Sequence, residues 1–276
     1  MDYLIYEKIN FRGGIVLSPL GKYNLVHDSP LQQAFTRPLV DRFVIPTTLS
    51  EPAAGFYGSF YPTESAKLDY EIYITNGFRA LTAQGVNRFS ITNGVRDGRA
   101  SDKFDVNDRP AMVGRLAYSP FLGLEVAYST HVGTYDQLRN NRLGINAADL
   151  TYQRGPFEFL AEFAYDKIGR DDFAQSSGVP GDMWGYYLQP NYHFMPEWLK
   201  KAAPAFFKDD SSFTVFTRWD HVDLDGNTLQ KVTPGLTYRP TPDTVFGLDY
   251  QANIDNGAHE RVKDDSIIEA WFATYF

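Results

Sequence analysis

The chain has 276 residues, a mean hydropathy of -0.35 and no cysteine, which excludes a disulfide framework and thiolate chemistry. It lacks a run of about 18 apolar residues, so a transmembrane helix is excluded; a transmembrane β-barrel is not, because barrel strands show only alternating hydrophobicity. A net charge of -8 argues against a nucleic-acid partner, and an aromatic content of 16% favours strands and interfaces.

Alternation of apolar and polar residues predicts thirteen strands, most of 9 to 12 residues. The expected strands cover residues 2–6, 11–20, 53–61, 67–75, 111–119, 124–131, 143–153, 157–166, 184–194, 213–222, 229–239, 244–254 and 266–276. In 143–153, Leu143 and Ile145 are out of phase with Leu150 and Tyr152, and a β-bulge would reconcile them.

Helix is expected in only one place, the connection 195–212, where Trp198 and Leu199 would seat a short helix under the barrel.

The connections between these strands alternate between long and short, with one exception on each side. The long set is 21–52, 76–110, 132–142, 167–181, 223–228 and 255–265. The short set is 7–10, 62–66, 120–123, 154–156, 195–212 and 240–243. Long external loops and short periplasmic turns are typical of outer-membrane barrels. We therefore predict an all-β fold, a transmembrane antiparallel β-barrel in which residues 1–276 form a single domain.

The two ends of the chain carry further expectations. Met1 leads directly into residues 2–6 without a basic segment and an apolar segment, so no signal peptide is visible. The first strand runs towards the periplasm, whereas an even-stranded barrel begins there, so we expect a truncated chain that lacks at least one strand, with about 14 to 16 in the complete protein. Phe276 is the expected contact for the barrel assembly machinery, although Thr274 occupies the usual aromatic position before it.

Two segments carry a family resemblance. GKYNLVHDSP at 21–30 and TRPLVDRFVIPTTLSEPAAGFYG at 36–58, supported by FMPEWL at 194–199 and Phe276, resemble the porin O and P family of phosphate-selective outer-membrane porins. The resemblance implies a barrel of about sixteen strands in the bacterial outer membrane, often a homotrimer, in contact with lipid and lipopolysaccharide. It also implies passage of small anions along basic pore-lining residues.

The charges expected inside the barrel do not support that anion selectivity. Five bases point inward by strand parity: Arg12, Arg115, Arg218, Lys231 and Arg239. Ten acids do so: Asp69, Glu71, Glu125, Asp149, Glu158, Glu162, Asp166, Asp220, Asp249 and Glu269. An acidic excess does not attract anions, so we predict a porin for passive diffusion of small hydrophilic solutes or ions and retain phosphate-like anions only through the resemblance.

The long segment 21–52 is the candidate constriction loop. It carries four charged residues that could face the lumen: Lys22, Arg37, Asp41 and Arg42. The alternative is that this segment packs over the mouth of the barrel.

Two other functional classes stay open. A barrel enzyme such as a phospholipase would use one of five histidines, with His193 the candidate, but neither Gly-x-Ser-x-Gly nor His-Glu-x-x-His occurs, and we predict no enzyme activity and no cofactor. The second class is a soluble β-sandwich binding protein. Aromatic residues near strand ends favour a membrane girdle instead: Tyr70, Tyr118, Tyr128, Trp184, Tyr192 and Trp219.

Two acidic groups resemble metal sites. Asp223, Asp225 and Asn227 match the start of a calcium loop but lack its later glutamate, so we interpret them as a hairpin turn. Asp97, Asp102, Asp105 and Asp108 are interpreted as a solvated loop. We therefore predict no metal.

Overall fold

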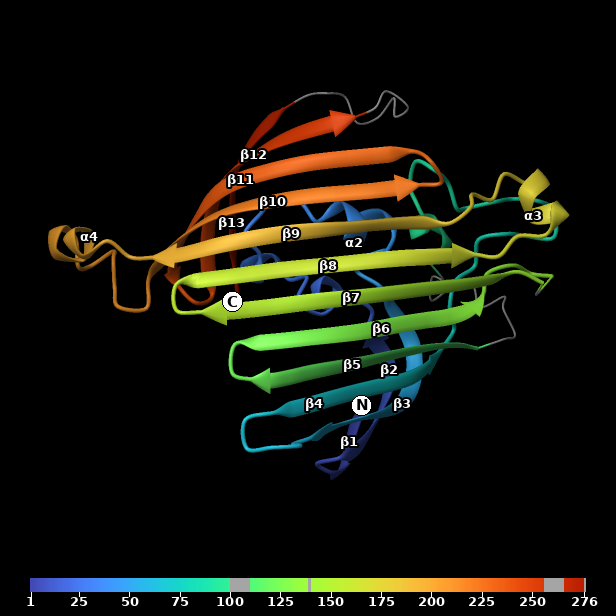
Figure 1. The fold of residues 1–276 in the computed structure, drawn as a ribbon, viewed down its shortest axis with the longest axis horizontal. Coiled ribbons are helices and arrows are strands. Elements are labelled where there is room, and N and C mark those ends of the chain that lie inside the picture. The colour runs from blue at the N-terminus through green and yellow to red at the C-terminus, as the bar shows by residue number, and fades with distance from the viewer. Residues whose placement is uncertain (100–109, 139, 256–265, 276) are drawn as a thin grey trace.

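The structure is a computed structural model that describes residues 1–99, 110–138, 140–255 and 266–275. Thirteen strands form one antiparallel sheet in which each strand pairs with its neighbours in the sequence (Figure 1). The strands are β1 Asp2–Tyr6, β2 Ile9–Leu17, β3 Ser50–Phe60, β4 Lys67–Thr75, β5 Ala111–Phe121, β6 Leu124–Thr134, β7 Arg142–Arg154, β8 Phe157–Ile168, β9 Met183–Phe194, β10 Ser212–Leu224, β11 Thr228–Thr241, β12 Thr244–Asp255 and β13 Ile267–Thr274. The predicted all-β, antiparallel fold and its thirteen strands are confirmed.

Helices are short and lie in the connections, at α1 Lys22–Leu25, η1 Ser29–Leu31, α2 Leu39–Phe43, η2 Arg96–Gly98, α3 Asp172–Ser176 and α4 Glu197–Ala202. In the described residues, no helix is both long and apolar enough to cross a bilayer. The expectation of helix only after Phe194 is therefore wrong. For α2, the signal was the spacing of Leu39, Val40, Phe43 and Val44 between two prolines, which puts the apolar side chains on one helical face.

The sheet curls so that the inner loop, which we define as residues 18–49 between β2 and β3, lies on its concave side behind the central strands of Figure 1. Helix α2 contacts β8, β9, β10 and β11 from this side. In the order of the described strands, β1 and β13 occupy the two edges.

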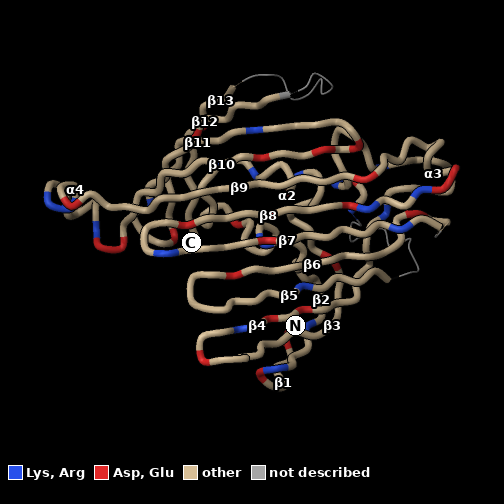
Figure 2. Tube along the Cα trace, viewed as in Figure 1, with Lys and Arg blue, Asp and Glu red and all other residues tan. Residues whose placement is uncertain are grey.

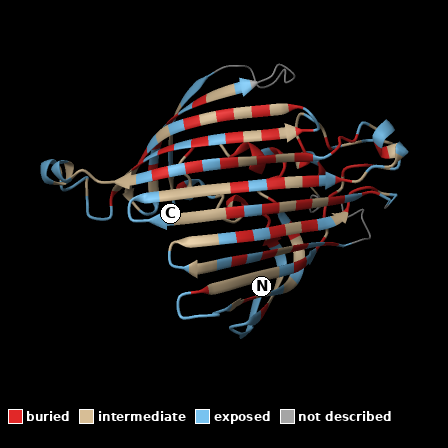
Figure 3. Ribbon diagram, viewed as in Figure 1, coloured by how far each residue is buried: buried red, intermediate tan, exposed pale blue. Residues whose placement is uncertain are grey.

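The two faces of the sheet differ in an unusual way. On β5, Met112 and Leu116 are about half exposed on the outer face, whereas Arg115 on the inner face is 7% exposed. Figure 3 shows the same alternation of buried and exposed positions along the central strands, and Figure 2 shows charged residues standing singly along them. Apolar residues on the outside and charged residues within are the pattern of a sheet that faces lipid.

Strand β7 pairs with β6 and β8 in an unbroken register, so the expected β-bulge is wrong. Leu143 and Ile145 point inward and are buried. They belong to a core that also contains Phe78 and Phe89 from the segment 76–99, between β4 and β5. Inward-facing apolar residues need no bulge because this connection supplies apolar partners inside the sheet.

The connections lie at two opposite ends of the strands, marked in Figure 1 by α3 and α4. Helix α4 projects away from the strands, and Trp198 is 67% exposed, so the expectation that Trp198 seats this helix under the sheet is wrong. In this connection it is Phe207 that packs against the sheet, because its ring contacts those of Phe213 on β10 and Tyr238 on β11.

Candidate pore constriction

Near its start, the inner loop is bound by Glu162 on β8. Its Oε2 atom accepts hydrogen bonds from the backbone N–H groups of Lys22 and Tyr23, both at 3.0 Å. Gly21 permits this approach, because its φ is +73° and a Cβ there would lie 2.1 Å from Glu162 Oε1. The loop therefore enters the concave side with its backbone bound to a carboxylate of the inner face.

Two further acids of the inner face bind the loop in the same way. Asp249 accepts from Phe35 N at 3.0 Å, and Asp220 accepts from Leu39 N at 3.0 Å. Charged acceptors make stronger hydrogen bonds than neutral ones, and the bond to Asp220 also satisfies the buried N–H of Leu39. Carboxylates on β8, β10 and β12 thus position the loop backbone.

Basic residues of the inner face bind loop oxygens. Arg218 donates to the Thr36 carbonyl at 2.9 Å, and Lys231 donates to Thr36 Oγ1 at 2.8 Å. Arg239 donates to the carbonyls of Pro30 and Gln32. The amide donors and carbonyl acceptors of one loop are therefore matched by acids and bases on the strands.

These contacts divide the residues predicted to line the pore, apart from the buried Arg115, into two groups. Glu162, Arg218, Lys231 and Asp249 are at most 4% exposed, and they anchor the loop. A pore-lining role stays a prediction for the members that keep more exposed surface: Arg12, Glu71, Glu125, Glu158, Arg239 and Glu269.

An ion-pair network joins the loop to β5, β6 and β7. Arg115 makes two hydrogen bonds to Asp149, at 2.5 and 2.8 Å, and lies 3.6 Å from Glu125. Glu125 also pairs with Lys22 of the loop at 2.8 Å. The acidic excess expected from the sequence is therefore partly neutralised inside the sheet.

Near the β1 edge, Arg12 pairs with Asp2 at 2.6 Å and with Glu71 at 3.5 Å. These three residues line a cavity of about 300 Å³ with Met1 and Leu25. Near the β13 edge, Trp271 donates to Asp249 at 3.0 Å, and Gln251 donates to Glu269.

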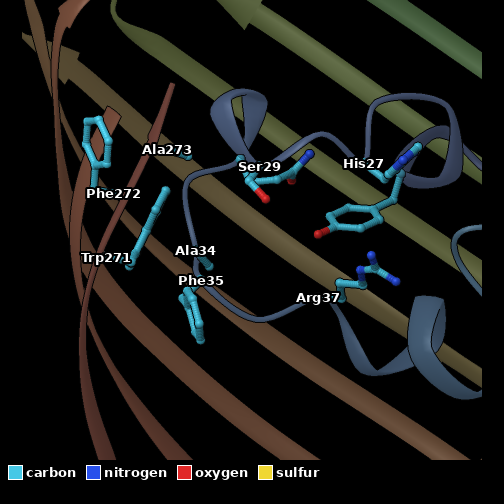
Figure 4. Close-up of a pocket in the computed structure, with 10 residues that line it drawn as sticks. His27, Ser29, Ala34, Phe35, Arg37, Trp271, Phe272 and Ala273 are labelled. Atoms are coloured by element: carbon cyan, nitrogen blue, oxygen red, sulfur yellow. The ribbon is translucent and has the colours of Figure 1, made fainter. Parts of the chain in front are cut away.

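A second cavity, of about 100 Å³, separates the inner loop from β13 (Figure 4). His27 and Arg37 line it from the loop, and Trp271 and Ala273 line it from the strand. Both cavities adjoin the inner loop close to the two sheet edges.

Four arginines gather where the inner loop meets the segment 76–99: Arg37, Arg42, Arg96 and Arg99. Burial, and then the charge of Arg96, lower the pKa of both Arg42 and Arg99. The hydrogen bonds found for Arg37 and Arg99 go to backbone carbonyls, among them Thr47 O at 2.6 Å from Arg37. This arginine cluster is a local positive region inside an acidic chain.

The sequence analysis did not identify Arg96 and Arg99 as candidate site residues, because they lie in a connection that was predicted to be a polar loop. The contact that brings them inside is Val95 N to Phe43 O, at 3.0 Å, between segments 52 residues apart in sequence. Gly94 makes the approach feasible, since its φ is +60° and a Cβ would lie 2.0 Å from Phe43 O.

The histidine named for a hydrolase, His193, lies between a hydroxyl and a carboxylate. Its Nδ1 atom is 2.9 Å from Thr214 Oγ1, and its Nε2 atom is 3.3 Å from Glu158 Oε2. The order resembles a nucleophile, base and acid, but Thr214 has no exposed surface, so a substrate carbonyl has no access to its hydroxyl.

The acidic groups considered as calcium ligands are engaged otherwise. Asp223 accepts from Gly226 N at 2.7 Å within a hairpin turn, and Asp225 accepts from Gly181 N at 2.8 Å. Within the described part of the chain, His, Asp and Glu side chains form no group of three that could hold a metal ion. Asp102, Asp105 and Asp108 lie outside the described residues.

Comparisons with known proteins place the fold among outer-membrane channels. No protein-family profile matches the chain. An uncharacterized protein of Aquifex aeolicus (strain VF5) is 26% identical over 269 residues, which cover 91% of this chain and 59% of that protein. The chain thus spans less than two thirds of the length of this relative.

Among solved structures, the outer membrane channel DcaP of Acinetobacter baumannii superposes with a TM-score of 0.51 and 10% identity, over 95% of this chain and 71% of that one. A porin refined at 1.8 Å gives a TM-score of 0.49 with 13% identity, over 97% and 77% of the two chains. The similarity to DcaP establishes a porin-type β-barrel fold.

Proposed function

We propose that this chain forms a channel for passive diffusion of small hydrophilic solutes or ions across the bacterial outer membrane. The observation that carries the proposal is the inner loop, which the strands hold on the concave side of a porin-type sheet through charged groups of β8, β10, β11 and β12. A loop fixed inside a barrel narrows its lumen and sets what passes. The α3 end, which carries the long connections, is the external end of this channel, and the α4 end is periplasmic.

We also propose that the arginine cluster gives the constriction a preference for small anions, as the resemblance to the porin O and P family implies. The electrostatic field at the narrowest point of a pore has the largest effect on ion selectivity, because solutes pass closest to the charged side chains there. Several acids of the inner face are neutralised by Arg115, Lys22 and Arg218, or bound by loop amides. Assembly as a homotrimer and recognition by the barrel assembly machinery remain predictions from the sequence.

The enzyme alternative has less support. A phospholipase would need an accessible hydroxyl beside His193, and the candidate Thr214 is fully buried. We therefore propose that the chain has no catalytic function.

Planar-bilayer recordings test the channel. Detergent-extracted protein should give stepwise conductance, with a reversal potential in a KCl gradient that indicates chloride preference. Replacement of both Arg42 and Arg96 by glutamine should lower the chloride-to-potassium permeability ratio by about twofold or more, because two unit charges leave the constriction. Arg154→Gln, on an exposed strand end at the α4 end, is the matched control and should leave the ratio unchanged.

Folded protein without steps above the lipid background would refute the channel. A permeability ratio that is unaffected by the double substitution would refute the arginine cluster as the selectivity element and leave the channel itself standing.

A further inference from the structure

The most deeply buried charged residue of the inner loop is Asp41, in α2. Asp41 is 0% exposed, and Glu162, the acid of β8 that binds the start of the same loop, is 2% exposed. Each carboxyl has one buried oxygen without a hydrogen-bond donor, Asp41 Oδ2 and Glu162 Oε1. The two carboxyl groups lie close enough to interact, because α2 packs against β8.

In the described part of the chain, no cationic side chain hydrogen-bonds to the carboxyl of Asp41 or of Glu162. Arg218, which is near Asp41, donates instead to Asp220 at 2.9 Å and to the Thr36 carbonyl. Asp41 Oδ1 accepts a long hydrogen bond, 3.3 Å, from Thr47 Oγ1, and Glu162 Oε2 accepts from two backbone amides of α1. Two adjacent buried carboxylates cannot both stay ionised without a large electrostatic cost.

We propose that Asp41 and Glu162 share a single proton, and that the resulting carboxylic acid to carboxylate hydrogen bond holds α2 against β8. The proton gives each orphaned oxygen a partner, and it removes one of two like charges from a site without exposed surface. Asp41 and Glu162 are thus positioning residues of the inner loop, and the loop loosens when the shared proton is lost.

Charged and titratable groups surround the pair. Burial, followed by the neighbouring Glu162 carboxyl, raises the pKa of Asp41 well above its usual range. The surrounding groups come from every packed element: Tyr23 of α1, Arg115 of β5, Asp149 of β7, Tyr187 of β9, Arg218 of β10 and Lys231 of β11. The arginines stay charged, and the tyrosines stay neutral, between pH 5 and 8.

The direction of the pH effect follows from linkage. In an undocked loop, Asp41 would be in water with its ordinary pKa of about 4. Because docking raises that pKa, the docked loop binds more protons than the undocked one, and docking weakens as the pH rises above about 4. Acid therefore favours the docked loop, and alkaline conditions favour release. Any consequence for conductance rests on the proposed channel function.

Thiol labelling tests the proposal without reference to conductance, because the chain has no cysteine of its own. Val40→Cys places a thiol in α2 at a fully buried position, and Glu64→Cys places one in an exposed turn at the α4 end. The ratio of their maleimide labelling rates at each pH cancels the intrinsic reactivity of the thiol. From pH 5.5 to 8.5 we expect this ratio to rise by at least about tenfold.

Two substitutions of Asp41 distinguish a shared proton from mere packing. In Asp41→Asn, the amide donates to Glu162 at every pH, so the ratio should stay low and flat. In Asp41→Ala, the hydrogen bond is absent, so the ratio should be high and flat. Glu162→Gln is the reciprocal variant and should resemble Asp41→Asn. The heat-induced gel shift of each variant shows that the barrel is folded.

A flat, low ratio in the parent, or an Asp41→Asn variant with the pH dependence of the parent, would overturn the proposal. So would a ratio that follows added calcium instead of pH, because the pair would then hold a cation. Labelling that behaves as expected in protein without conductance would support the shared proton and refute only the channel.

Discussion

At the residue scale, single glycines allow two connections to pack closely together on the concave side of the sheet. Gly94 and Gly155 have nearly the same backbone conformation, with φ of 60° and 58°. A Cβ at Gly94 would lie 2.0 Å from Phe43 O, whereas a Cβ at Gly155 would meet nothing within 4 Å. A comparison of these two glycines therefore distinguishes two effects of an added side chain. Backbone strain is common to both positions, whereas a steric clash with a neighbouring connection occurs only at Gly94.

Gly94→Ala should therefore destabilise the protein more than Gly155→Ala. Both substitutions incur about 1 kcal/mol of backbone strain, and Gly94→Ala adds at least about 2 kcal/mol because α2 and the segment 76–99 must separate. The measurement is the midpoint of the heat-induced gel shift. Equal midpoints for the two variants would contradict the contact between Gly94 and Phe43.

At the element scale, the inner loop behaves as an insertion with its own partners. Its two ends meet, since Ser18 N donates to Leu49 O at 2.8 Å, so the loop leaves and rejoins the sheet at one place. Between these ends, α2 supplies Leu39, Val40 and Phe43 to the buried core. The loop thus contributes packing as well as constriction.

Replacement of residues 20–47 by a four-residue Gly-Ser linker should raise single-channel conductance about twofold or more, because the loop no longer occupies the lumen. It should also lower the midpoint of the heat-induced gel shift, because the apolar face of α2 is lost. The same linker in place of residues 197–209, at the α4 end, is the control for shortening a connection. Unchanged conductance after removal of the inner loop would show that it does not narrow the pore.

At the scale of the whole molecule, the apolar outer face of the sheet indicates whether the protein lies in a lipid bilayer or in water. Leu116 in β5 and Leu122 in the following turn are 50% and 100% exposed. If the outer face were in water, a charged side chain at either position would cost little stability. In a barrel within a bilayer, only Leu116 lies along a strand that crosses the hydrocarbon region.

Leu116→Arg should destabilise the membrane-embedded barrel by about 2 to 4 kcal/mol, and Leu122→Arg should have little effect. Reversible urea unfolding in lipid vesicles measures the difference. Equal tolerance of both substitutions, together with folding in the absence of detergent, would favour the soluble β-sandwich instead.

The alternation of polar and apolar residues was sufficient for the strands, the inward-facing charges and the side on which each connection lies. That pattern is local, because side chains two residues apart share a face of a sheet. The inward-facing bases Arg115 and Arg218 were identified for this reason, as was the hairpin turn at Asp225 and Gly226.

The partners of those charges are not local. Neither the burial of Asp41 against Glu162 nor the approach of Arg96 to Arg42 appears in any strand pattern. The segment that carries Asp41 was predicted to be a constriction loop without defined contacts, and the segment that carries Arg96 was predicted to be a loop. Their place inside the sheet follows from long-range contacts, such as Val95 N to Phe43 O, and from glycines without a Cβ at the crossing points. The sequence by itself determined a barrel-type sheet with charges on its inner face; only the tertiary structure decided what those charges bind, because hydrogen bonding and exclusion of water depend on distances between segments far apart in the chain.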